Sequence, residues 1–196
     1  MKAAAWITAL LLVAGGWIWT TQGGLEIRCV DCLLLRSHGH GGFERNASSC
    51  LKTLASAQAD FRGNDRDANG VQEFWRADVA GLYTLLPKGS TDPIKLIELS
   101  VAAADDRPVA PIAPFATSAP KNGYWFRAIW KKGEPPINAT AQFAFCAFPA
   151  AYGKTGKMTF ILDEGNRVYK ADLGHGRGIE QFPDDAELAA RWSRLD

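Results

Sequence analysis

The stretch QFAFCAF, residues 142–148, decides the fold class. In an extended chain, successive side chains point to opposite faces of a sheet, so the residues of this stretch separate into two sets. The sets are Phe143, Phe145 and Ala147 on one face, and Ala144, Cys146 and Phe148 on the other. Both sets are apolar, and a strand with two apolar faces has to be covered on both sides. We therefore expect this stretch to form a central strand.

Strand-like segments lie on both sides of the central strand. They are residues 123–130 (GYWFRAIW), residues 157–163 and residues 167–172. Turn residues separate them, with Pro135-Pro136 in the first connection and Glu164-Gly165-Asn166 in a hairpin. A short helix over residues 184–192 closes the chain. Connections this short favour antiparallel neighbours, so we expect a small antiparallel meander.

Upstream of residue 107 the apolar residues recur with helical spacing. A helix is expected to begin near Asn46, Ser48 or Ser49, which are good N-cap residues, and to end at Gly63. A second short helix or turn is expected over residues 74–83, and Asp92-Pro93 is typical of a third helix start. Helices first and strands afterwards predict an α+β domain over residues 46–196.

The N-terminal residues differ from the rest of the chain. After Lys2 no charged residue occurs between Ala3 and Gln22, and such a run is just long enough to span a bilayer. We expect residues 1–22 to be a retained membrane anchor or a cleaved signal segment, followed by a Gly-rich linker over residues 23–45. Either alternative predicts a single-pass or exported protein whose domain lies on the extracytoplasmic side of the cell membrane.

The overall charge excludes one class of function. The formal net charge is +1, whereas a general nucleic-acid binder usually carries a strongly basic surface, so no nucleic-acid partner is expected. Seven Trp and ten Phe residues in 196 favour an aromatic-rich β core over a helical bundle.

Three stretches of the C-terminal half carry a family resemblance: GYWFRAI (123–129), FPAAYGKTGKMTFI (148–161) and RVYKADLG (167–174). They resemble an uncharacterised family of exported bacterial proteins with a "domain of unknown function" label, and the likeness extends over residues 46–196. Some variants of that family have the plan of type IV pilins and pseudopilins, in which a hydrophobic anchor leads to a helix and a small antiparallel sheet. This sequence departs from pilins because it has no prepilin-type cleavage motif before its apolar run. The resemblance implies no known activity.

The segment DRDANGVQE, residues 65–73, contains a candidate calcium site. Oxygen-bearing residues at alternate positions around a Gly-centred turn can converge on one Ca²⁺ ion. The expected ligands are the side chains of Asp65, Asp67, Asn69 and Glu73 and the carbonyl of Val71. Arg76 stands where an EF-hand would have its bidentate glutamate, so the loop is not an EF-hand. The alternative is a solvated polar turn in which Asp and Asn bond to their own backbone.

The four cysteines leave several alternatives open. Cys29 and Cys32 form a C-x-x-C that fits a structural disulfide, idle thiols, a redox pair, or a zinc site with His38 and His40. Cys50 and Cys146 can join the helix to the central strand, or each can be a small core residue.

Two further motifs fit a serine-enzyme pattern. Ser49-x-x-Lys52 and Lys154-Thr155-Gly156 are similar to elements of penicillin-binding serine enzymes, but no S-D-N element stands between them and the chain is short for that fold. We therefore expect a non-enzymatic envelope protein that binds partners or assembles with itself in a pilin-like way. A thiol-redox or serine acyl-transfer enzyme is the alternative.

Overall fold

The computed structural model describes residues 11–13, 16–21, 24–29, 40–110, 117–131 and 140–195. The chain divides into two compact units, residues 1–39 and 40–196, and each is described by itself.

The described part of the first unit is a small antiparallel sheet. Its strands are β1 (Leu11–Val13), β2 (Gly16–Thr21) and β3 (Gly24–Cys29), in the order β1-β2-β3. Strands therefore occupy residues for which the sequence predicted a membrane-spanning helix. The β-formers Trp17, Ile18, Trp19, Thr20 and Thr21 explain the difference, because aromatic and β-branched side chains favour extended backbone. Within the described ranges, no helix is both long and apolar enough to cross a membrane.

The second unit is built on a six-stranded sheet in the order β8-β4-β5-β6-β7-β9. The strands are β4 (Tyr124–Lys131), β5 (Ala144–Pro149), β6 (Met158–Asp163), β7 (Val168–Asp172), β8 (Gln181–Phe182) and β9 (Ser193–Arg194). The four long strands are those predicted, and they pair in antiparallel fashion. β8 pairs with β4 in parallel, so the sheet is mixed rather than the expected pure meander.

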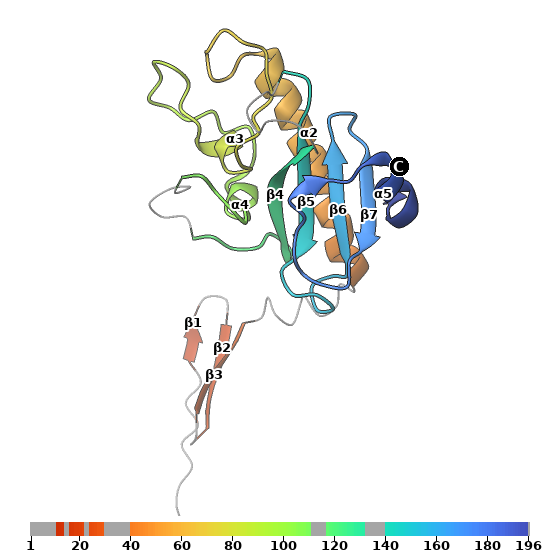
Figure 1. Cartoon of the computed structure of the whole chain (residues 1–196). Helices are drawn as coiled ribbons and strands as arrows, with labels where there is room; N and C mark the ends of the chain where they lie inside the picture. The colour runs from red at the N-terminus through yellow and green to blue at the C-terminus, as the bar shows by residue number, and fades with distance from the viewer. Residues whose placement is uncertain are drawn as a thin grey trace, which may run out of the picture. The chain divides into compact units, whose positions relative to one another are not determined.

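β5 lies inside the sheet between β4 and β6, as predicted (Figure 1). Its six residues are all buried, and alternate side chains enter different cores. Phe143, Phe145 and Ala147 belong to the larger core beneath the helices. Ala144, Cys146 and Phe148 belong to a smaller core on the opposite face. The alternation read from the sequence therefore describes this strand correctly.

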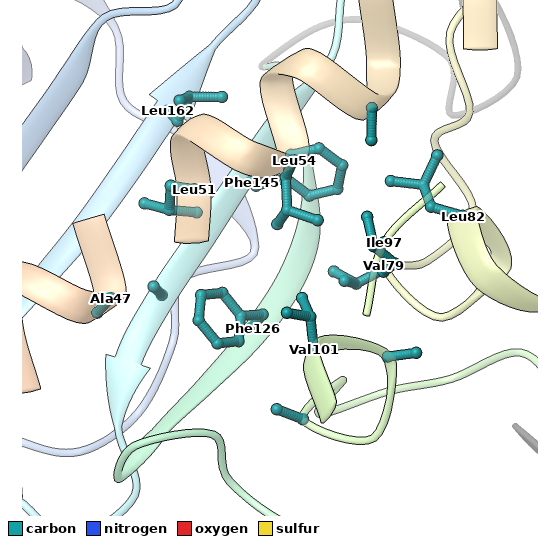
Figure 2. Packing of buried hydrophobic residues seen from close by; sticks show 14 of the residues in the cluster. Ala47, Leu51, Leu54, Val79, Leu82, Ile97, Val101, Phe126, Phe145 and Leu162 are labelled. Carbon is teal, nitrogen blue, oxygen red and sulfur yellow. The ribbon is translucent and has the colours of Figure 1, made fainter. Parts of the chain in front are cut away.

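The longest helix, α2 (His40–Gly63), packs against one face of β5, β6 and β7 (Figure 1). Leu51 and Leu54 are fully buried there, close to Phe145 and Leu162 of the sheet (Figure 2). The helix ends at Gly63 as predicted but begins before Asn46. Tertiary contacts extend it, because Phe43 packs on the larger core and Glu44 accepts hydrogen bonds from the backbone of Lys157 and Met158.

The remaining helices are short. α3 (Gly81–Thr84) lies at the end of the segment expected to form a second helix or turn, and residues 74–80 are not helical. α5 (Asp185–Arg191) confirms the closing helix. The helix predicted from Asp92-Pro93 is wrong: a short helix, α4 (Leu99–Ala102), starts later. Lys95 has a φ of 48°, and the backbone on either side of it is bonded instead to Leu82, Tyr83 and Leu85. These contacts hold the segment in a non-helical conformation.

Candidate functional site

The acidic loop, residues 65–73, connects the end of α2 to the segment that leads into α3. Gln58 of α2 fixes the far end of this loop. Its amide nitrogen donates to the carbonyl of Trp75, and its amide oxygen accepts from the Trp75 N–H over 2.9 Å. The Gln58 side chain is 0% exposed, although glutamine is most often a surface residue. The signal that was missed is its spacing, since it follows Leu51 and Leu54 on the same face of the helix.

The near end of the acidic loop is held by the last turn of α2. The backbone N–H of Arg66 donates to the carbonyl of Phe61, and the guanidinium of Arg66 forms a bidentate pair with Asp60. The carbonyl of Asp67 accepts from the N–H of Lys88 over 3.0 Å. The loop is therefore fixed at both ends and in the middle.

Within the loop, the oxygen-bearing side chains are joined through Asn69. Its amide nitrogen donates to Oδ2 of Asp67 over 2.7 Å and to Oε1 of Glu73 over 2.8 Å. Its amide oxygen accepts from the N–H of Val71, and Oδ2 of Asp65 accepts from the N–H of Gly70. The structure thus brings all five predicted residues into one hydrogen-bonded turn. An amide nitrogen, rather than a shared point of carboxylates, links Asp67 to Glu73.

Two carboxylate oxygens in the loop lack a donor. Oδ1 of Asp65 and Oδ1 of Asp67 are both buried from solvent and have no hydrogen-bond partner among the described residues. The pKa of Asp67 is raised, first by desolvation and then by contact with the carboxyl group and charge of Asp65. The two carboxylates therefore lie close enough to oppose each other's ionisation.

The loop offers oxygen atoms, which hard cations prefer, but few of them belong to acidic side chains. Across the described residues, no three side chains of His, Cys, Asp or Glu gather closely enough to hold a metal ion. Any cation here would draw its ligands from Asp65 and Asp67 and complete its shell with neutral oxygens. Hard cations such as Ca²⁺ accept carbonyl, amide and water oxygens in this way.

A second acidic pair, Asp78 and Asp105, bonds to the backbone around α3, and no motif in the sequence pointed to it. Oδ2 of Asp105 accepts from the N–H groups of Val79 and Ala80, and Oδ1 accepts from that of Arg107. Burial raises the pKa of Asp105 to about 6.

Asp78, the other member of this pair, accepts from the indole of Trp75 and the N–H groups of Gly81 and Val109. Every oxygen of the two carboxylates accepts from a donor, so the pair fastens the backbone around α3.

The cysteines that the structure describes remain free thiols. Cys50 packs at the edge of the larger core, whereas Cys146 is buried in the core on the opposite face of the sheet. Of the two alternatives for Cys50 and Cys146, the pairing is therefore wrong because the sheet separates them, and each is a small residue that packs on a core. Of the proposed zinc and redox residues, Cys32 and His38 lie outside the described residues, as do the side chains of Cys29 and His40.

The residues of the serine-enzyme pattern lie on α2 and in the turn between β5 and β6. Ser49 is exposed on α2, and its carbonyl accepts from the hydroxyl of Thr53. The hydroxyl of Thr155 is bonded to the backbone of Ala151 within a tight turn, and Lys154 is exposed in the same turn.

The stretches that carry the family resemblance meet at one end of the sheet. The hydroxyl of Tyr152 donates to Oδ1 of Asp172 over 2.9 Å, which joins the turn after β5 to the end of β7. Gly153 and Gly174 both have a positive φ, near 74° and 73°, which side chains rarely adopt. The positive φ explains glycine at these two positions, since a Cβ atom at either would meet no atom within 4 Å.

Comparison with known proteins gives one result at the level of the family. No curated protein and no solved structure matches the chain. A family model described as "Protein of unknown function (DUF2950)" matches residues 14–184, which include the acidic loop and the four long strands. The chain belongs to this DUF2950 family of proteins of unknown function.

Proposed function

We propose that the protein is an exported, non-enzymatic binding domain whose acidic loop holds one Ca²⁺ ion. One observation carries this proposal: Asp65 and Asp67 each bury a carboxylate oxygen that has no donor among the described residues. A buried carboxylate oxygen without a partner costs about 1–3 kcal/mol or more. A cation bound between the two groups would remove that cost for both.

Calcium fits this loop better than other common cations. It accepts six to eight oxygens in a flexible geometry, including carbonyls, amides and water. Asp65 and Asp67 would supply the carboxylates, and the carbonyl of Val71 would add a neutral ligand. Rotation of the Asn69 side chain would turn its amide oxygen, in place of its amide nitrogen, toward the ion. Calcium sites in extracellular modules are weak, with Kd values of about 10⁻⁴–10⁻³ M, which suits a small loop with few charges.

The location and the binding role rest on other features. The uncharged run over residues 3–22 supports export to the extracytoplasmic side of the membrane, by an anchor or by a cleaved signal. A 24-residue helix packed on a sheet supports the pilin-like comparison and with it a role in assembly or in partner binding. In this role the ion would be structural, because it would stiffen the loop that ends at the Gln58–Trp75 contact.

Thermal unfolding of the full chain tests the calcium proposal. Saturating Ca²⁺ at about 100 times Kd stabilises a protein by about 2.7 kcal/mol, which corresponds to a rise of about 5–10 °C in Tm for a domain of this size. The rise should vanish in Asp67→Asn and persist in Asp92→Asn, a matched change at an exposed aspartate outside the loop.

A shared proton between Asp65 and Asp67 predicts a different result. If the two carboxylates share a proton instead of binding a cation, Asp67→Asn should stabilise the protein at neutral pH. Calcium would then leave the Tm of the wild-type chain unchanged, and the calcium proposal would be withdrawn.

A further inference from the structure

A pocket adjoins the acidic loop. A pocket of about 370 Å³ opens between the C-terminal half of α2 and the turn that joins β6 to β7. Pockets of about 300–1,000 Å³ are typical of small-molecule sites. Gln72 and Phe74 line it from the acidic loop and the residue after that loop, and Phe143 lines it from the strand side. Small residues of α2, Ala55 and Ala59, leave the space open.

The pocket combines an aromatic wall with a guanidinium group. Phe74 and Phe143 pack with their ring centroids 4.8 Å apart. The guanidinium carbon of Arg62 lies 5.1 Å from the centroid of Phe74, so Arg62 is stacked over this ring. Stacking holds the planar guanidinium in place and leaves its N–H groups at the edge available. No carboxylate or carbonyl among the described residues accepts from the Arg62 side chain.

The other polar groups that line the pocket form no hydrogen bond or ion pair with Arg62 within the described part of the chain. The amides of Gln72 and Asn166 both line the pocket, and neither side chain has a hydrogen bond within the described part of the chain. Glu164, an acidic residue of the lining, is paired through Oε1 with Lys131 at 2.6 Å, and its Oε2 is buried without a hydrogen-bond partner among the described residues. Arg66, four residues beyond Arg62, is by contrast fully engaged with Asp60.

We propose that this pocket binds a carboxylate carried on an apolar or aromatic group, with Arg62 as its anchor. The fork of a guanidinium matches the two oxygens of a carboxylate, and the hydrogen bonds formed are charge-assisted. The amides of Gln72 and Asn166 donate further hydrogen bonds, and the apolar part of the ligand packs on the Phe74–Phe143 wall. This site does not depend on a cation in the acidic loop.

Phenylacetate and phenylacetamide make a matched pair of probes, because they share one shape and differ in charge. Each is titrated into the ¹⁵N-labelled full chain, and chemical-shift changes are followed by NMR. Phenylacetate should give saturable shifts at residues around the pocket, and phenylacetamide should bind at least about tenfold more weakly, as the loss of a charge-assisted hydrogen bond predicts.

Two variants assign the effect to Arg62. Arg62→Gln should weaken phenylacetate binding by about tenfold or more, whereas Arg66→Gln should leave it unchanged. Equal affinity for the two probes, no saturable shifts with phenylacetate, or wild-type affinity in Arg62→Gln would each overturn the proposal. If Arg62→Gln does not fold, the comparison of the two probes on the wild-type chain decides alone.

Discussion

Gly156 lies directly against Tyr124: a Cβ atom added at Gly156 would stand 2.1 Å from the Tyr124 hydroxyl oxygen. Tyr124 is fully buried at the start of β4, and its hydroxyl donates to the carbonyl of Met158 over 3.0 Å. The tyrosine therefore cannot move aside without losing this hydrogen bond and its place in the core. This contact explains why a glycine follows Thr155 in the turn between β5 and β6.

The substitution Gly156→Ala should accordingly destabilise the domain. Overpacking of this kind costs about 1–3 kcal/mol, measured as the free energy of unfolding in urea. Gly41→Ala is the control, since a Cβ there meets no atom within 4 Å and a helical alanine gains about 1 kcal/mol over glycine. Equal stability of Gly156→Ala and the wild type would show that the turn relaxes freely.

Asp105 should make stability depend on pH in the acidic range. Its pKa is raised to about 6 in the folded state, so between about pH 4 and pH 6 the folded protein holds a proton that the unfolded chain has released. Stability from this group is therefore greatest below pH 4 and falls by about 3 kcal/mol as the pH rises to about 6. The raised pKa of Asp67 acts in the same direction.

The variant Asp105→Asn isolates this contribution. An amide cannot accept on both sides, so one of the N–H groups of Val79, Ala80 or Arg107 loses its acceptor, at a cost of about 1–3 kcal/mol. Near pH 7 this cost is offset because the variant no longer buries a charge, which costs the wild type about 3 kcal/mol. The difference between wild type and variant should grow as the pH falls from 6 to 4, because only the wild type gains from protonation. Urea unfolding at several pH values measures it, and parallel pH profiles would contradict the assignment.

Gln58 should contribute to the stability of the domain and should fix the conformation at the end of the acidic loop. Gln58→Leu keeps the side-chain size but leaves the N–H and the carbonyl of Trp75 without partners, at about 1–3 kcal/mol for each group. Thr53→Ala, an exposed change on the same helix, should cost much less. Hydrogen exchange of the Trp75 amide gives an independent measurement, since its protection should be lost in Gln58→Leu.

The two described cysteines should differ in reactivity. Burial raises the pKa of Cys146 to about 12 and also raises that of the half-buried Cys50. In a Cys29→Ser/Cys32→Ser background, a thiol reagent should modify Cys50 slowly and Cys146 only after unfolding, because the thiolate is the reactive form. Peptide mapping without reductant should show no Cys50–Cys146 disulfide, and its recovery would contradict the separation of the two faces.

The β half of this domain could be predicted because its signals are local. Alternation identified β5 with its two apolar faces, and turn residues separated the long strands. β8 could not be predicted because two residues show no periodicity, and because it pairs with Lys131, which is far from it in the sequence. The early start of α2 depends likewise on Phe43 and Glu44 contacts that no local pattern displays.

The candidate site shows the same limit. Spacing alone singled out Asp65, Asp67, Asn69 and Glu73, and these residues do lie in one turn. The role of Asn69 as the link, the burial of Gln58 and the stacking of Arg62 on Phe74 depend on side-chain directions. Those directions are set by packing between segments that are distant in sequence, so the pocket could not be found by inspection of motifs.

The short strands at the two ends of the six-stranded sheet have a consequence for self-association. β8 pairs with the end of β4, and β9 pairs with part of β7. Each of the two outer long strands therefore has a short strand along part of its outer edge. An open strand edge would invite a donor strand from another molecule, and natural proteins avoid such growth by covering or shortening their edges. If copies of this domain polymerise, their contacts should therefore be made by side chains on helix and loop surfaces, and the resulting polymer should dissociate without any exchange of strands.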